Sequence, residues 1–211
     1  MTGIVHFETF LIAGILLNLT PGNDTIFILT KSIAQGRKAG ILSVLGIATG
    51  SLIHTTLAAF GLSVIIAKSA LAFTIVKYAG AAYLLYLGFK MITDRSQLNA
   101  NILTTDKKIN SLRIYRDAVL TNVLNPKVAL FFIAFLPQFI HPDFQNSVVP
   151  FLLLGLTFTI TGTIWCMMLA SFSSFLFSKL RNNQKFSSWL NKICGAVLIG
   201  LGIKIALAGK R

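Results

Sequence analysis

Long apolar runs separated by short polar connections dominate the chain. Six of these runs are long enough to cross a hydrocarbon core of about 30 Å as helices. They are Phe7–Lys31, Ala39–Ala67, Ala70–Ile92, Ala118–Ile140, Val148–Phe177 and Trp189–Ala208. The second and fifth runs exceed the length of a perpendicular span, so we expect them to tilt or to extend past the bilayer. The pattern predicts an all-α integral membrane protein of about six transmembrane helices.

One long polar stretch divides the chain into two halves. We expect a first three-span repeat over residues 1–92, a cytoplasmic linker over 93–117 and a second three-span repeat over 118–211. Lys and Arg are concentrated in the linker and in the other connections on its side of the membrane. Because basic connections stay in the cytoplasm, this distribution places both termini outside. A re-entrant segment in place of one full span would move one terminus to the other side.

The two halves are faintly similar. Lys77–Lys90 in the third run resembles Lys192–Lys204 in the sixth, and Asn18–Pro21 in the first run resembles Asn122–Pro126 in the fourth. A repeated unit with three spans must enter the membrane in opposite directions, which is the inverted-repeat plan of many transporters. Chance similarity between Gly- and Leu-rich helices is the alternative.

Composition agrees with a membrane location and argues against nucleic-acid binding. Of the 211 residues, 55% are hydrophobic and 12% are charged, whereas soluble domains carry about 25% charged residues. The formal charge is +13, but the basic residues lie between apolar runs and not on one polar face. We therefore expect the lipid bilayer, and no nucleic acid, as the surroundings of this chain.

The stretch from Asn18 to Asn23 is the most informative motif. Pro21 removes a backbone donor and Gly22 adds conformational freedom, so the first span should break here. A break inside a membrane is tolerated only where protein or an aqueous cavity covers the freed amides and carbonyls. Together with Asn18, Thr20 and Asn23, those groups would form a polar pocket suited to an amino or carboxylate group.

Asp24 follows this break directly and is the one acidic residue well inside an apolar run. An ionisable side chain within a membrane costs about 2.5–3.5 kcal/mol on insertion scales, so it is a candidate functional residue. The alternative is that Asp24 lies near the interface and pairs with Lys31.

A second motif, Asn122, Asn125, Pro126 and Lys127, should break the fourth span in the same way. Lys127 lies near the middle of that run, where a lysine is as costly as an aspartate. We expect it to pair with Asp24 across the two breaks and to contact a bound substrate. Snorkelling along the helix towards the interface is the alternative.

The second run carries Gly46, Gly50, His54 and Ala58 at intervals of four, so these residues share one helix face. The two glycines form a small-xxx-small pattern that favours close helix packing. His54 could carry a proton or could simply be hydrogen-bonded within the bundle. No metal-ligand pair, catalytic triad motif or phosphate loop stands out, so we expect neither an enzyme nor a cofactor.

Taken together, these motifs resemble those of the LysE/RhtB superfamily of bacterial amino-acid exporters. The matching segments are Asn18–Asp24, the basic turn Ala34–Gly40, Asn125–Lys127 and Phe135–Phe139. Two residues depart from the family pattern. Asn23 replaces a common second proline, and Ser51 replaces a common acidic residue before the span-two histidine, which weakens a proton-relay role for that histidine.

The resemblance implies proton-driven efflux of small amino acids or their analogues, such as homoserine, threonine, leucine or lysine, across the bacterial inner membrane. Asp24 would then be the natural proton carrier, with His54 as the second candidate. The Gly-rich faces allow a homodimer. The leading hypothesis is therefore a multi-pass secondary exporter whose substrate site lies at the two proline breaks.

Two rival functions remain on sequence grounds. A membrane enzyme acting on lipid or quinone would need clustered His, Asp or Glu side chains, and would be active in detergent without a gradient. A partner subunit without transport of its own would co-purify with another protein and show no flux in liposomes.

Overall fold

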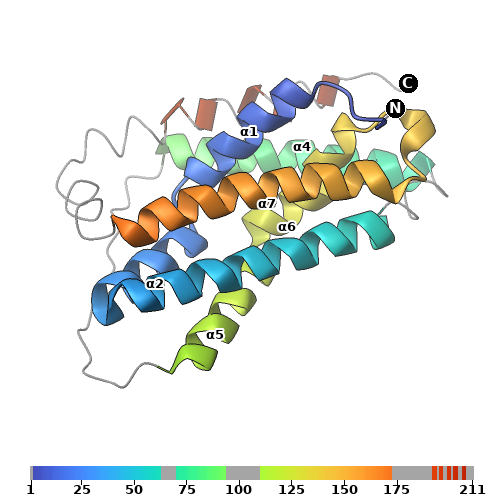
Figure 1. Ribbon diagram of the computed structural model, residues 1–211. Coiled ribbons are helices and arrows are strands. Elements are labelled where there is room, and N and C mark those ends of the chain that lie inside the picture. Colours follow the sequence, from blue (N-terminus) through green and yellow to red (C-terminus); the bar gives the residue numbers. More distant parts are fainter. Residues whose placement is uncertain are drawn as a thin grey trace.

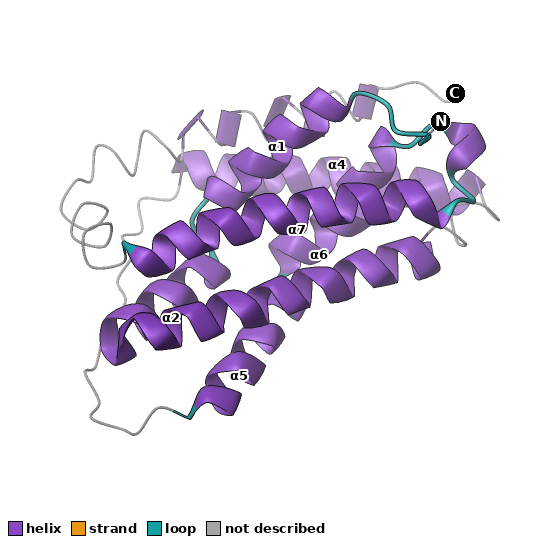
Figure 2. Cartoon of the chain, in the orientation of Figure 1, coloured by secondary structure: helices purple, strands orange, loops and turns teal. Residues whose placement is uncertain are grey.

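The computed structural model describes residues 2–62, 70–93 and 110–172, with isolated short stretches between 192 and 207. Most of the predicted sixth span, residues 94–109 of the predicted linker and the basic connection after the fifth span lie outside the described residues. The described part is helical and has no named strand, which confirms the all-α class. Figure 2 shows the long helices lying side by side.

The helices follow the predicted runs closely, with interruptions. In chain order the elements are α1 (Phe7–Leu19), α2 (Asn23–Leu57), the π-helical turn η1 (Ala58–Leu62), α4 (Ala70–Thr93), α5 (Ser111–Val123), α6 (Pro126–Leu130), η2 (Phe131–Phe135), η3 (Leu136–Phe139), η4 (Pro142–Phe144) and α7 (Val148–Ser171). Figure 1 shows α7 between α1 and the later half of α2.

By length and apolar composition, two of the described helices could cross a membrane, Asn23–Gly61 and Val148–Ser171. A third crossing results if Ser111–Val123 and Pro126–Phe139, which meet at a bend of 46°, form one span. At 13 residues, α1 is only about 20 Å long and does not cross by itself. α4 occupies the predicted third span.

A helix ends shortly before each of the two prolines, since α1 ends at Leu19 and α5 ends at Val123. Thr20, before Pro21, is extended with ψ 120°, and Asn125, before Pro126, is extended with ψ 108°. Steric clash with a following proline ring drives a residue out of the α region, which explains both conformations. The first interruption covers residues 20–22 and the second covers residues 124–125.

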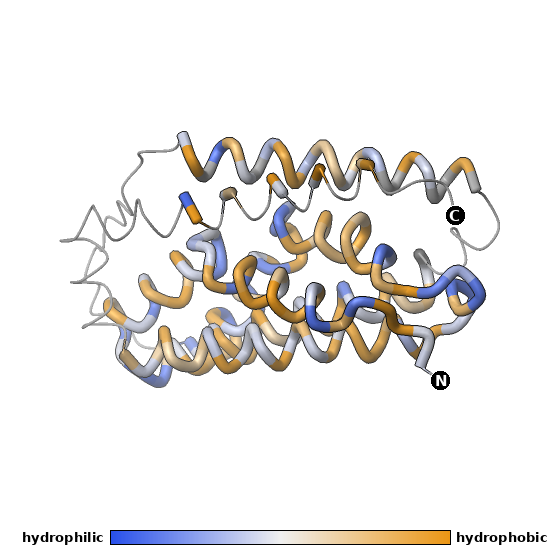
Figure 3. The backbone as a smooth tube through the Cα atoms, turned by 90° about the horizontal axis from the view of Figure 1, so that it is seen from above, coloured by the Kyte–Doolittle hydropathy of each residue, from blue (hydrophilic) through white to orange (hydrophobic). Residues whose placement is uncertain are grey.

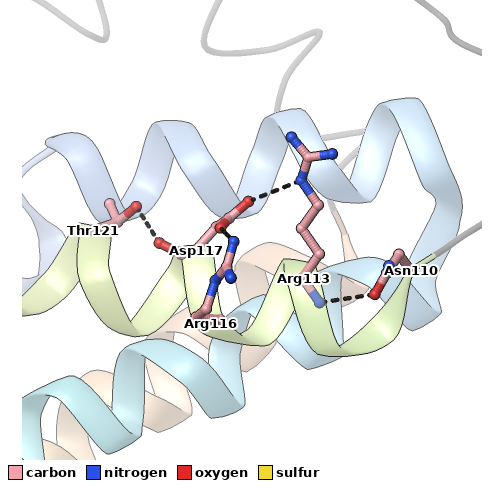
Figure 4. Close-up of polar contacts among 5 residues, drawn as sticks. All are labelled: Asn110, Arg113, Arg116, Asp117 and Thr121. Atoms are coloured by element: carbon pink, nitrogen blue, oxygen red, sulfur yellow. Dashed lines mark hydrogen bonds and ion pairs between the residues drawn. The ribbon is translucent and has the colours of Figure 1, made fainter.

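Two helix boundaries differ from the sequence-based ones. The first run does not end at Lys31; the helix continues until Gly36, whose φ of 81° turns the chain into the later half of α2. α5 starts at Ser111, inside the stretch predicted as linker. The side chain of Asn110 caps this helix by accepting from the backbone N–H of Arg113, and Asp117 pairs with neighbouring arginines (Figure 4).

Small residues allow two pairs of helices to approach closely. A β-carbon on Gly46 in α2 would lie 2.5 Å from the β-carbon of Ala118 in α5. A β-carbon on Gly50 would lie 2.7 Å from the β-carbon of Asn122 in α5. The predicted packing role of these glycines is thus confirmed. α1 and α7 meet in a similar way, because a β-carbon on Gly162 would lie 3.0 Å from Oδ1 of Asn18.

Aromatic side chains form the core at one end of the bundle. The rings of Phe131 and Phe158 stack with their centroids 4.4 Å apart, and Phe10 meets Phe139 edge-to-face at 5.4 Å. These contacts join α1, η2, η3 and α7. At the same end the N-terminal segment is tied to the chain after η3, since Val5 N–H donates to the carbonyl of Phe139.

The outer faces of the helices remain apolar. Leu71 and Phe89 on α4 are 70% and 65% exposed, and Ile160 on α7 is 58% exposed. Figure 3 shows hydrophobic positions along the full length of the described helices. Such faces would be a liability in water but suit contact with lipid chains.

Candidate functional site

A small pocket lies where the two interruptions face α2 and α7. It has a volume of about 30 Å³, which is room for about two water molecules. Five of the predicted site residues line it, Asn18, Gly22, Asp24, Asn122 and Lys127. We call it the central pocket. Its remaining lining residues are Thr25, Val44, Ile47, Ala48, Ser51, Val128, Phe158, Thr159, Gly162, Thr163 and Cys166.

Lys127 links the second interruption to the first. Its Nζ donates to the backbone carbonyls of Leu17 and Thr20, both at 2.9 Å. The last carbonyls of a helix have no partner within it and attract cations. Lys127 therefore compensates the end of α1 that the interruption leaves open. A β-carbon on Gly22 would lie 3.4 Å from this ammonium group, so glycine leaves the lysine room.

Asp24 lies in the first turn of α2, where the helix dipole favours a negative charge. Its Oδ2 accepts a hydrogen bond of 2.8 Å from Nδ2 of Asn122, in the last turn of α5. Oδ1 of Asp24 and Oδ1 of Asn122 are both buried and accept no hydrogen bond from the described part of the chain. The pocket thus contains two acceptor oxygens that need a donor.

Each interruption therefore holds the charged residue of the other. Lys127 binds carbonyls of the first interrupted segment, and Asn122 of the second interrupted segment binds Asp24. Asp24 and Lys127 line the same pocket. Direct pairing of their charges during a transport cycle stays a prediction.

His54 is buried next to the pocket and does not line it. Its Nε2 lies 3.2 Å from the backbone carbonyl oxygen of Asn122, and its ring stacks on Phe132. Because a carbonyl can only accept, Nε2 must carry the hydrogen. His54 thus supports the residue that binds Asp24, and its role as a proton carrier stays a prediction.

The other predicted site residues shape the interruptions. Thr20 is buried, and its hydroxyl donates to the carbonyl of Leu16 at 2.8 Å. Asn125 is also buried and caps α6 by accepting from the backbone N–H of Lys127. Pro126 is the first residue of α6, where a missing N–H costs nothing. Neither Thr20 nor Asn125 lines the central pocket.

Two further predicted residues stand apart from the pocket. Pro21 lies within the first interruption and Asn23 is exposed at the start of α2. Substrate contact by Thr20, Pro21, Asn23, Asn125 or Pro126 stays a prediction. The arrangement favours a conformational role for the two prolines.

Asn18 reaches α7 from the last turn of α1. Its Nδ2 donates to the hydroxyl of Thr161 at 3.3 Å and lies 3.5 Å from the carbonyl of Phe158. This bond holds the end of α1 against the pocket wall.

The site residues predicted from the sequence include none from α7. Thr159, Gly162, Thr163 and Cys166 face the pocket with the spacing of one helix face. That spacing was a usable signal, but small and hydroxyl residues on a membrane helix do not by themselves indicate a site. Ser51, noted only as a departure from the family pattern, also lines the pocket.

Comparison with known proteins decides the family. A model of the LysE type translocator family matches residues 15–209. The chain belongs to this family. It is therefore a membrane protein of amino-acid transport and efflux, and the resemblance found from its motifs is confirmed.

Several LysE family relatives match over nearly the whole chain. An uncharacterized membrane protein of Bacillus subtilis, YrhP, is 34% identical over 92% of this chain and 94% of its own length. An uncharacterized membrane protein of Vibrio cholerae is 31% identical over 94% and 95%. The leucine efflux protein of Salmonella typhimurium is 29% identical over 97% and 96%. No solved structure gives a significant match.

Proposed function

We propose that this LysE family member exports small amino acids or their analogues across the bacterial inner membrane as a multi-pass, proton-coupled secondary transporter. One observation carries the proposal: the two interrupted segments meet at a pocket that contains Asp24, Lys127 and two buried oxygens that accept no hydrogen bond from the described residues. Interrupted helices that present charged and backbone groups to a common site are typical of secondary transporters. The leucine efflux relatives support an amino acid as the substrate.

We also propose six crossings arranged as two inverted repeats, broken at Pro21 and Pro126. The contacts between α1 and α7 match those between α5 and α2, with the same spacing of four residues. Gly14 and Asn18 face Phe158 and Gly162, and Ala118 and Asn122 face Gly46 and Gly50. In both pairs the residue numbers rise together, so the paired helices run in the same direction.

The third and sixth predicted spans support the same architecture. A β-carbon on Gly88 would lie 2.6 Å from the carbonyl oxygen of Gly195, and one on Gly202 would lie 3.0 Å from that of Ala81. Along this contact the residue numbers of one segment rise while those of the other fall, so the two segments are antiparallel. Six alternating crossings require parallel spans one and five, parallel spans two and four, and antiparallel spans three and six. The described contacts agree with all three requirements.

The pocket in this structure has a volume of about 30 Å³, which is room for about two waters and too little for an amino acid. Export therefore requires the pocket to widen. We propose that an entering carboxylate draws Lys127 away from the carbonyls of Leu17 and Thr20. Releasing the end of α1 would let the two interrupted segments separate and open the pocket.

Efflux from cells loaded with a dipeptide tests this function. Peptidases in the cells hydrolyse the dipeptide. Cells that contain the protein should then export the released amino acids faster than cells without it. Lys127→Met should reduce export at least tenfold, since a hydrogen bond to a charged group contributes about 1.5–3 kcal/mol. Lys38→Met, at an exposed position, is the matched control and should export at the wild-type rate. Wild-type export by both Lys127→Met and Asp24→Asn would show that the site is elsewhere.

A further inference from the structure

Two buried oxygen atoms in the central pocket lack a hydrogen-bond donor among the described residues, and this indicates what binds to Asp24. Oδ1 of Asp24 and Oδ1 of Asn122 are buried acceptors without a donor from the described residues, whereas Oδ2 of Asp24 already accepts from Asn122. Leaving a buried acceptor unsatisfied is costly, and more so for a charged group. A hydrogen-bond donor beside this carboxylate, either water or preferably a cationic group, would therefore stabilise the pocket.

Resting on the proposed export function, we propose that the α-ammonium group of the substrate and the coupling proton occupy Asp24 in turn, and that their competition couples the two fluxes. An ammonium group carries a positive charge and three donors, so it can donate to Oδ1 of Asp24 and keeps two donors for other acceptors. A proton on Oδ1 removes the charge and converts that oxygen into a donor. The ammonium group and the proton each compensate the negative charge of Asp24, and only one of them can be bound at a time.

Among the described residues that line the pocket, Asp24 is the only carboxylate. No second carboxylate there could bind the proton while Asp24 binds the ammonium group. α6 presents Lys127, α7 presents Cys166, and α1 and α5 present the uncharged Asn18 and Asn122. His54, in the later half of α2, reaches Asp24 only through Asn122. Lys127 is positively charged and bound to the carbonyls at the end of α1, where it is placed to take the substrate carboxylate.

The exchange balances in protons and charge. On the cytoplasmic side the protonated Asp24 carboxyl group loses its proton to water as the substrate ammonium group binds the carboxylate. On the outer side the substrate leaves and a proton returns to Oδ1. One proton enters for each amino acid that leaves. Because the amino acid is a net-neutral zwitterion, each cycle moves one positive charge inward, so membrane potential and pH gradient both drive export.

Proton release on binding tests the shared site directly. Purified protein in weakly buffered detergent solution, with a pH indicator, is titrated with the amino acid that the efflux assay shows to be exported, leucine being tried first. The titration is repeated at successively lower pH. Wild type should release about one proton for each amino acid bound. Binding without any proton release by wild type would overturn the inference while leaving the export function intact.

Variants separate a shared site from two separate sites. Asp24→Asn provides an amide oxygen that can still accept from Asn122, but no charge, and should lose both proton release and amino-acid binding. Asp24→Glu should retain proton release. Asp143→Asn is the matched control, since that acid is exposed within η4 and should behave as wild type. Wild-type affinity in Asp24→Asn would place the ammonium site elsewhere and refute the inference.

Kinetics in liposomes provide an independent readout. Competition by one proton should raise the apparent KM for the amino acid by up to about tenfold for each unit that the pH falls. The maximum rate of amino-acid counterflow should stay unchanged. A pH-independent KM in wild type would contradict competition. A wild-type protein that transports no amino acid at all would instead refute the proposed function.

Discussion

Replacing Gly50 with alanine tests the contact on which the pocket geometry depends. A β-carbon at this position would lie 2.6 Å from Oδ1 and 2.7 Å from the β-carbon of Asn122. Carbon atoms in contact prefer about 3.5–4.0 Å, so α2 and α5 would have to separate by about 1 Å. Asn122 would move with α5, and its 2.8 Å bond to Asp24 would lengthen beyond hydrogen-bonding distance.

The size of the effect follows from two opposing terms. Overpacking a tight contact costs about 1–3 kcal/mol, and replacing glycine by alanine within a helix gains about 1 kcal/mol. Gly61→Ala is the matched control, because no atom of the described residues lies within 4 Å of a β-carbon there and only the gain applies. We therefore expect Gly50→Ala to be less stable than Gly61→Ala by about 1–3 kcal/mol.

Thermal unfolding in detergent, followed by circular dichroism, measures this difference. For a chain of this size 1 kcal/mol shifts Tm by about 2–4 °C, so Gly50→Ala should melt at least 2 °C below Gly61→Ala. Its export should fall as well, since the Asn122–Asp24 bond is weakened. Equal Tm values for the two variants, with export retained in both, would refute the close approach of α2 and α5.

Two further predictions concern residues outside the pocket lining. We expect His54→Leu to reduce export, because the carbonyl of Asn122 loses a buried donor at a cost of about 1–3 kcal/mol; His54→Gln, which can still donate, should retain more export and full proton release in the indicator assay. Export at the wild-type rate by His54→Leu would contradict this role of His54. Asn110→Ala should lower the stability by about 1 kcal/mol through loss of the α5 cap. It should leave the KM of export unchanged, because Asn110 does not line the central pocket; a changed KM would show that the cap acts on the site.

The site could be predicted only in part, because only some of its residues are unusual in a membrane helix. Asp24 and Lys127 were identifiable since a charge in an apolar run is costly and needs a function. Thr159, Gly162 and Cys166 were not, because such residues are ordinary on a packed membrane helix. Which polar residues line the pocket and which only shape the chain also needed the structure, as Asn122 and Asn125 show.

The sequence by itself indicated the helical membrane class, the family resemblance and two prolines near which the chain leaves helical conformation, but not the turn at Gly36. These properties are local: apolar run length, the exclusion of a residue before proline from the α region and the intervals between small residues all act within a few turns. The tertiary structure alone decided which groups satisfy the interrupted helices. Lys127 lies 107 residues from Thr20 and Asn122 lies 98 residues from Asp24. Hydrogen bonds between such distant segments depend on the packing of whole helices, which no local pattern specifies.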